Sequence, residues 1–263
     1  MSIEQNIAMT GPLTYQTIGT GQDLVLIHGW GVSSAIWEPV VKQLSEHYCV
    51  HLVNLPGFAG EPELETYSLE NVAETLLAYL PEKAVWCGWS LGGLIATYIA
   101  HHYPERVDKL IQVCAALKFV EAASWQGVKK EVFSAFKLGV TKQPQKTLNR
   151  FLSLLAMGSE TVKTDITTIK QLMSDQIEAK PSALLGGLIL LDEVDLRDEF
   201  SQLTMPSLSL LGEHDNLVSV ANKTKLSELS PMNQQVILQQ SSHAPFISEP
   251  ILFNQVLISF IDA

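Results

Sequence analysis

The chain has 263 residues, of which 46% are hydrophobic and 17% charged, and its formal net charge is −11. This length can bury a sizeable core, so we expect one large domain or one domain with an insertion. The composition is too apolar for a disordered chain. The acidic balance argues against a nucleic-acid partner, which needs a basic face, and against adsorption to anionic membranes.

Signals for targeting or disulfide formation are mostly absent from the sequence. Residues 1–21 contain no basic cluster followed by an apolar run, which argues against a secretory signal, and no apolar run is long enough to span a bilayer. The three cysteines, Cys49, Cys87 and Cys114, are scattered within apolar, strand-like runs. This pattern favours reduced core thiols over a disulfide or a metal site. We therefore expect a cytoplasmic protein without a metal.

Short β-rich runs alternate with amphipathic, helix-like stretches along the chain. The expected strands are, in order, 24–27, 49–53, 84–87, 110–114, 207–211 and 236–238. The expected helices between them include 37–47, 69–80 and 91–102. This alternation predicts an α/β fold, with a mostly parallel central sheet covered by helices on both faces and ligands at the carboxyl ends of its strands.

Residues 118–188 interrupt this alternation and show the pattern of helices. Apolar side chains recur there at helical spacing, at Val132, Phe133 and Phe136 and again at Leu148, Phe151, Leu152 and Leu155. We expect a helical cap over the functional edge of the sheet, inserted into a core made of residues 1–117 and 189–263. The alternative is an ordinary packing subdomain.

The strongest local motif is Gly88-Trp89-Ser90-Leu91-Gly92-Gly93. It follows an expected strand and opens an expected helix, which is the context of a G-x-S-x-G turn that exposes a nucleophilic serine. The turn is sharp, and side chains in place of Gly88 or Gly92 would collide with neighbouring backbone. The motif therefore predicts Ser90 as the nucleophile, although glycine and serine are also common in ordinary loops.

A serine nucleophile needs a base, which in turn needs an orienting acid. In this fold both follow the serine in chain order. His243 follows the last expected strand in a loop, and we expect it to be the base, with His214 as the weaker candidate. Asp215 follows the preceding strand and is expected to accept the second N–H of the histidine, with Glu213 as its nearest competitor.

The loop His28-Gly29-Trp30-Gly31 closes the first expected strand. In this fold that loop supplies one backbone N–H of the oxyanion hole, and the residue after the nucleophile supplies the other. The predicted donors are Trp30 and Leu91, and loss of one such donor typically costs about 3–4 kcal/mol in transition-state stabilisation. We expect His28 to brace the loop rather than take part in chemistry.

These motifs resemble the α/β-hydrolase superfamily over the whole chain. Within it, the sequence is similar to the biotin-pathway carboxylesterases that act on pimeloyl-[acyl-carrier protein] methyl ester. The matching stretches are residues 28–31, 54–58, 88–94, 103–107, 150–158 and 243–250. The Trp-Ser-Leu-Gly-Gly turn and the Phe-Leu-x-Leu-x-x-Met-Gly run are the more specific of these; the other motifs occur in many hydrolases.

The resemblance implies a serine esterase that releases methanol from the pimeloyl chain without a metal or organic cofactor. It makes Ser90, Asp215 and His243 the catalytic triad. The residues implied to contact the substrate are Trp30, Ser90, Leu91, Phe151, Leu152, Ser153, Leu154, Leu155 and His243. Two departures, Asn54 in place of a common Asp and the stretch 59–63, affect local loop shape only.

The same triad would also serve other reactions. A general short-chain esterase, a lactonase, a carbon–carbon hydrolase or a cofactor-free perhydrolase are the alternatives among enzymes. Dehalogenases and epoxide hydrolases are disfavoured because they need Asp where Ser90 stands. A non-catalytic binding protein of this fold is disfavoured because it has no need of all three triad residues.

The net charge of −11 is unevenly distributed. Residues 118–188 contain ten basic and six acidic residues and carry +4, whereas the rest of the chain carries −15. A basic cap could dock an acidic acyl-carrier protein, with Lys142, Lys146 and Arg150 at helical spacing on one face and Lys163 nearby. The alternative is a set of solvated lysines. We expect a monomer that binds neither nucleic acid nor membrane.

Overall fold

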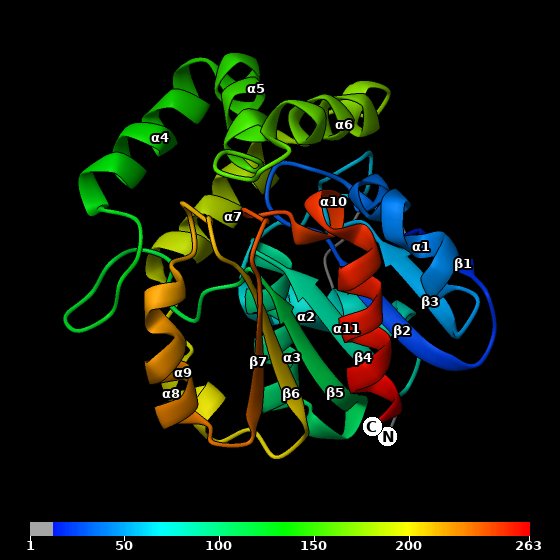
Figure 1. Cartoon of the computed structure of the whole chain (residues 1–263). Coiled ribbons are helices and arrows are strands. Elements are labelled where there is room, and N and C mark those ends of the chain that lie inside the picture. Colours follow the sequence, from blue (N-terminus) through cyan, green and yellow to red (C-terminus); the bar gives the residue numbers. More distant parts are fainter. Residues whose placement is uncertain (1–12) are drawn as a thin grey trace.

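The computed structural model describes residues 13–263, in which seven strands form one sheet of order β1-β3-β2-β4-β5-β6-β7 (Figure 1). The strands are β1 (Tyr15–Ile18), β2 (Gln22–Ile27), β3 (Tyr48–Val53), β4 (Ala84–Trp89), β5 (Val107–Val113), β6 (Ser207–Gly212) and β7 (Asn233–Leu238). All neighbours pair in parallel except β1 with β3. The expected mostly parallel sheet is confirmed.

Strand β1 is the one strand of the described chain that the sequence did not predict. Its four residues are exposed or half-buried, so it lacks the apolar run that marks the central strands. By contrast, β4 and β6 are buried along their whole length, as expected for strands covered on both faces.

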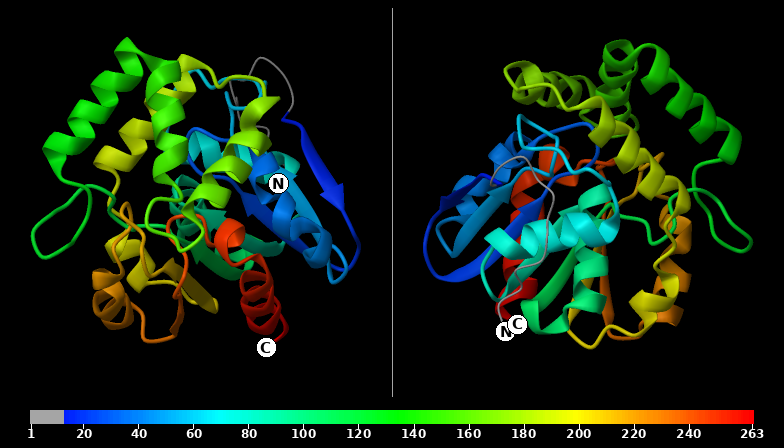
Figure 2. Two further views of the ribbon diagram at one scale, coloured as in Figure 1. Left: turned by 45° about the horizontal axis from the view of Figure 1, so that its top comes forward. Right: turned by 180° about the vertical axis from the view of Figure 1, so that it is seen from behind.

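Helices cover both faces of the sheet (Figures 1 and 2). Helix α1 (Glu38–Leu44), which follows the 3₁₀ turn η1 (Ser34–Trp37), packs against the C-terminal α11 (Pro250–Asp262) on one face. Helices α2 (Leu69–Tyr79) and α3 (Leu91–His102) pack together on the other. The shorter elements are η2 (Pro104–Arg106), α8 (Arg197–Ser201), η3 (Val220–Asn222), α9 (Lys223–Leu229) and α10 (Pro245–Ser248).

Four further helices lie between β5 and β6, and three of them form a layer beyond the sheet, at the top of Figure 1. They are α4 (Lys130–Lys142), α5 (Pro144–Leu154), α6 (Val162–Ser174) and α7 (Pro181–Glu193), which leads back to the sheet. The expected boundary at residue 188 falls inside α7. This helix continues to Glu193 because Leu190 and Leu191 remain buried against the rest of the protein.

Two sequence departures from the resemblance have local structural roles. The Asn54 side chain accepts a hydrogen bond from the Ser34 amide at 2.8 Å, at the start of η1. Glu61 is buried and accepts a hydrogen bond from the Thr14 amide at 2.9 Å. Both side chains therefore shape loops.

Within residues 13–263, no helix is both long and apolar enough to cross a membrane. Residues 1–12, on which part of the expectation about a secretory signal rests, lie outside the described residues. All three cysteines are free, and Cys87 and Cys114 are buried whereas Cys49 is half-buried.

Candidate active site

Ser90 lies at the sharp turn between β4 and α3. Its backbone has φ 53° and ψ −116°, a conformation that residues other than glycine rarely adopt. A Cβ atom on Gly88 would lie 2.2 Å from the Gly92 carbonyl oxygen, and one on Gly92 would lie 2.4 Å from the Ile27 carbonyl oxygen. Both positions therefore require glycine, as the motif predicts. The Ser90 amide donates to the Val113 carbonyl at 3.0 Å, which anchors the turn to β5.

Asp215 and His243 form a buried pair at the ends of β6 and β7. The Nδ1–H group of His243 donates to Asp215 Oδ2 at 2.7 Å, and the two side chains are 0% and 1% exposed. The other carboxylate oxygen, Oδ1, accepts from the amides of Leu217 and Val218 at 2.8 and 3.0 Å. His243 Nε2 is buried without a hydrogen-bond partner in the described part of the chain. The pair thus presents a free imidazole nitrogen that can accept a proton.

The backbone of His243 is held from two sides. Trp89 Nε1 donates to the His243 carbonyl at 2.7 Å, and the two rings lie 5.5 Å apart. The His243 amide donates to the carbonyl of Leu155, after α5, at 3.2 Å. The residue next to Ser90 therefore positions the histidine loop. The sequence did not predict this role of Trp89. The one available signal was the position of Trp89 within the turn motif.

His28 braces the loop after β2. Its Nδ1–H donates to the Gly29 carbonyl at 2.7 Å, and its Nε2 accepts from the Leu55 amide at 2.9 Å. Burial lowers the pKa of His28 to about 4, so the ring is neutral near pH 7 and can accept at one nitrogen while donating at the other. Its geometry is that of a brace, as expected from the sequence.

Trp30 lies in a loop that approaches Ser90, and Leu91 follows Ser90 directly in sequence. A Cβ atom on Gly29 would lie 3.2 Å from the Ser90 Cβ, so the loop that carries Trp30 passes close to the serine. Within residues 13–263, neither the Trp30 nor the Leu91 amide donates to a protein acceptor. Two unpaired N–H groups beside a serine can bind an oxyanion.

The competing acid and histidine lie outside this arrangement. Glu213 and His214 are both exposed, and neither side chain contacts His243 through a hydrogen bond in the described residues. Their neighbour Asp215 is the residue whose carboxylate turns inward.

Ser90 opens into a pocket whose other lining side chains are all apolar. Trp30 forms one wall, and its ring packs edge-on against Phe136 and Phe151 at centroid distances of 5.3 and 5.0 Å. The remaining lining residues are Phe119, Val128, Val132, Phe133, Leu154, Leu188, Leu191 and Leu217. Such a pocket suits a hydrocarbon chain with its reacting carbonyl at Ser90.

Of the five residues 151–155 predicted to contact substrate, only Phe151 and Leu154 line this pocket. Leu152 lines a neighbouring hollow, and Ser153 faces the outer surface of α5. Leu155 is fully buried. The difference follows from helical geometry, because only residues three or four apart share a face.

Several pocket residues were missed as ligand contacts by sequence reasoning. Phe133 and Phe136 on α4 carried a signal, namely apolar residues at helical spacing. Phe119, Val128 and Leu217 come from loops, and no periodicity marked them.

The segment after α5 contacts both loops that carry the acid and the histidine. The Met157 carbonyl accepts from Ser242 Oγ at 2.8 Å and from Asn216 Nδ2 at 2.7 Å. The buried Asp165 of α6 accepts from Ser248 Oγ of α10 at 2.8 Å, as well as from two hydroxyls of its own segment. These bonds couple the helical insert to the histidine loop.

Cys114 lies directly beside this pair. It follows β5 with φ 44°, and its sulfur lies within 4.8 Å of ligating atoms of Asp215 and His243. Burial raises the pKa of its thiol well above the usual range, so the group stays neutral. The sequence predicted a core thiol, and it indicated no proximity to the acid.

The expected alignment of Lys142, Lys146 and Arg150 on one helix face is wrong. Lys142 ends α4, and Gln143 is not helical (φ −144°, ψ 66°) because Pro144 starts a new helix. Lys146 and Arg150 lie on α5 and line an open hollow together with Lys170 of α6. None of these three forms an ion pair within the described residues, and Lys163 is exposed outside the lining of this hollow.

Comparison with known proteins identifies the family of this chain. A family described as alpha/beta hydrolase fold matches residues 24–250. A pimeloyl-[acyl-carrier protein] methyl ester esterase from Vibrio vulnificus is 44% identical over 96% of this chain and 99% of its own length. One of the same name from Vibrio cholerae is 42% identical over the same shares.

Solved structures show the same fold at lower sequence identity. An esterase from Exiguobacterium antarcticum superposes with a TM-score of 0.85 at 23% identity, covering 95% of this chain and 96% of that one. An enol-lactonase from Burkholderia xenovorans gives a TM-score of 0.83 at 20% identity, covering 95% and 96%.

Proposed function

The chain belongs to the α/β-hydrolase fold family, and we propose that it is a serine carboxylesterase acting on pimeloyl-[acyl-carrier protein] methyl ester in biotin synthesis. The products would be pimeloyl-[acyl-carrier protein] and methanol. The observation that carries the proposal is a strained Ser90 that opens into an apolar pocket, together with the buried Asp215–His243 pair held by the neighbouring Trp89. The names of the relatives, which this chain matches over nearly their whole length, indicate the substrate.

In the proposed mechanism, Ser90 Oγ attacks the ester carbonyl while His243 Nε2 takes its proton. Asp215 stabilises the resulting imidazolium through the 2.7 Å bond to Nδ1. The oxyanion accepts hydrogen bonds from the Trp30 and Leu91 amides. His243 then gives its proton to the departing methoxide, which leaves as methanol. Water, deprotonated by the same nitrogen, attacks the acyl-enzyme and releases the free carboxylate and Ser90.

The pocket supports an acyl chain as the bound group. Its lining offers no charged or polar side chain apart from Ser90, so methylene groups are favoured there by about 0.8 kcal/mol each. A charged group placed among these apolar side chains would be desolvated without a partner. The lining therefore favours an uncharged hydrocarbon chain over a charged one.

We further propose that α4–α7 act as a cap that docks the carrier protein. The support is the hollow lined by Lys146, Arg150 and Lys170, beside Leu154 and Met157, which are 41% and 45% exposed. A basic rim around exposed apolar side chains is complementary to an acidic protein partner. Lys142 and Lys163 would add long-range attraction only.

All groups of the proposed mechanism come from one chain, which supports a monomer as the active form. A carrier-linked substrate also supports a cytoplasmic location. Neither a metal nor an organic cofactor has a step in this mechanism.

The decisive experiment is complementation of a biotin-requiring strain that lacks this esterase step. Growth without biotin is the expected result, and the Ser90→Ala variant should fail to restore it because kcat falls by about 10⁶-fold. A soluble protein that cleaves a short p-nitrophenyl ester but does not restore growth would favour a general short-chain esterase instead.

A further inference from the structure

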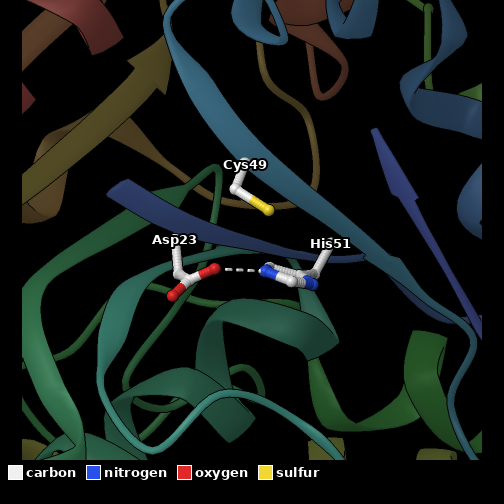
Figure 3. Close-up of side chains that lie close together, drawn as sticks. All are labelled: Asp23, Cys49 and His51. Carbon is white, nitrogen blue, oxygen red and sulfur yellow. Dashed lines mark hydrogen bonds and ion pairs between the residues drawn. The ribbon is translucent and has the colours of Figure 1, made fainter. Parts of the chain in front are cut away.

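Three potential metal ligands lie together on one face of the sheet, away from Ser90. They are Asp23 on β2 and Cys49 and His51 on β3 (Figure 3). Asp23 and Cys49 are direct partners in the parallel register, and His51 is two residues further along the same strand. Because alternate residues share a face, the three side chains project to the same side. Their ligating atoms all lie within 4.8 Å of one another.

His51 has a polar contact at each of its ring nitrogens. Its Nε2 lies 2.6 Å from Asp23 Oδ1, and its Nδ1 lies 3.2 Å from Thr17 Oγ1 on β1. When Nδ1–H donates to Thr17, the Nε2 lone pair points into the space that Asp23 shares. A contact at the second ring nitrogen fixes the tautomer of a ligating histidine, and Thr17 Oγ1 lies where it could provide one. A cation bound between Nε2 and Oδ1 would replace this 2.6 Å contact.

The three donors select the class of cation. A thiolate, an imidazole and a carboxylate are together typical of zinc sites, whereas calcium and magnesium prefer oxygen ligands. With bonds of about 2.0–2.3 Å at tetrahedral angles, two zinc ligands lie about 3.5 Å apart. To bind zinc, the side chains would have to rotate to that spacing, because the paired strands hold the backbone in place.

We propose that Asp23, Cys49 and His51 bind a zinc ion, with a fourth coordination position open to solvent. The Asp23 side chain is 35% exposed and Cys49 is half-buried, so a hydrated cation can reach the cluster. The expectation of core thiols is wrong for Cys49, which is half-buried, whereas Cys87 and Cys114 are buried. The ion would link β2 and β3 directly and β1 through Thr17.

The site lies towards the amino ends of β2 and β3, whereas Ser90 follows the carboxyl end of β4. Zinc at this site is therefore a structural ion that takes no part in ester hydrolysis. Because it binds the folded protein, it raises the unfolding temperature as its concentration rises.

Titration of the full chain with Co²⁺ tests the proposal, because thiolate-bound cobalt absorbs strongly in the near ultraviolet. We expect that band at one cobalt per chain, displaced by zinc and absent in Cys49→Ser. His51→Gln and Asp23→Asn should each weaken zinc binding at least about tenfold, and Thr17→Val by about tenfold. His47→Gln, which changes an exposed histidine just before β3, is the matched control and should bind as the unchanged chain does.

Hydrolysis of a short p-nitrophenyl ester reports whether each variant is folded, and we expect it to be unchanged. Alkylation of Cys49 in the unchanged chain gives a test that needs no variant. Zinc should slow it at least tenfold, while buried Cys87 and Cys114 stay unmodified. Three results would overturn the proposal. They are a cobalt spectrum without the thiolate band, a zinc affinity of Cys49→Ser and His51→Gln equal to that of the unchanged chain, and alkylation of Cys49 that zinc does not slow.

Discussion

Replacement of Asp215 by Asn tests the proposed acid–base pair with little change in shape. Asp215 Oδ1 accepts from the amides of Leu217 and Val218, so the asparagine oxygen must take that position. Its NH₂ group then occupies the place of Oδ2 and faces His243 Nδ1, now as a donor. The ring must accept at Nδ1 and carry its proton on Nε2. The nitrogen proposed as the base loses its lone pair.

The expected loss in kcat is about 10⁴-fold, the size found when a triad acid is changed to its amide. This corresponds to about 5.4 kcal/mol of activation free energy. The assay is kcat and KM for a short p-nitrophenyl ester near pH 7, with the unfolding temperature as a measure of intact structure. Glu213→Gln, which changes the exposed neighbouring acid, is the matched control and should keep full activity. A folded Asp215→Asn variant with activity within tenfold of the unchanged chain would refute the tautomer argument.

Three further predictions concern the cap, its attachment and the brace. Changing Lys146 and Arg150 together to Glu should slow hydrolysis of the carrier-linked substrate at least tenfold and leave a small ester unaffected; equal loss on both substrates would contradict docking at α5. Asp165→Asn removes the charge from three buried hydroxyl contacts and should lower the free energy of unfolding by about 1–3 kcal/mol in denaturant titrations, with kcat falling because the histidine loop loosens. Unchanged stability would exclude this role. Because burial lowers the pKa of His28 to about 4, the unfolded chain binds the extra proton below about pH 6.5, so stability is full above that pH and falls by about 3 kcal/mol as pH drops to 4. His28→Gln should flatten that part of the stability curve.

The fold class and the main motifs could be predicted from sequence because they depend on local backbone requirements. The six expected strands contain short, mostly apolar runs, and each reappears in the sheet. The positions of Gly88 and Gly92 follow from the steric demands of one turn, which a short sequence encodes completely. The triad remains a prediction: Ser90 was identified from its turn motif, and Asp215 and His243 from the order of strands and loops. Strand β1 was not predicted because its mostly exposed residues form no apolar run.

Contacts between distant segments were decided only by the tertiary structure. Because helix α5 begins at Pro144, Lys142 and Lys146 lie on different helices. The orientation of α5 places Leu154, rather than Leu152, in the lining of the pocket. Loop residues such as Phe119 reached that pocket through packing that no periodicity encodes.

The clearest case is the cluster of Asp23, Cys49 and His51. In sequence, Asp23 directly precedes one apolar run, whereas Cys49 and His51 lie in the next, with a helix between them, and nothing in either stretch marks a shared site. The parallel register of β2 with β3 places Asp23 beside Cys49, and β1 adds the hydroxyl of Thr17 next to His51. Local sequence thus determined the strands and the turn at Ser90, because these depend on neighbours along the chain. The pairing of strands determined which side chains meet, because that depends on hydrogen bonds between segments far apart in sequence.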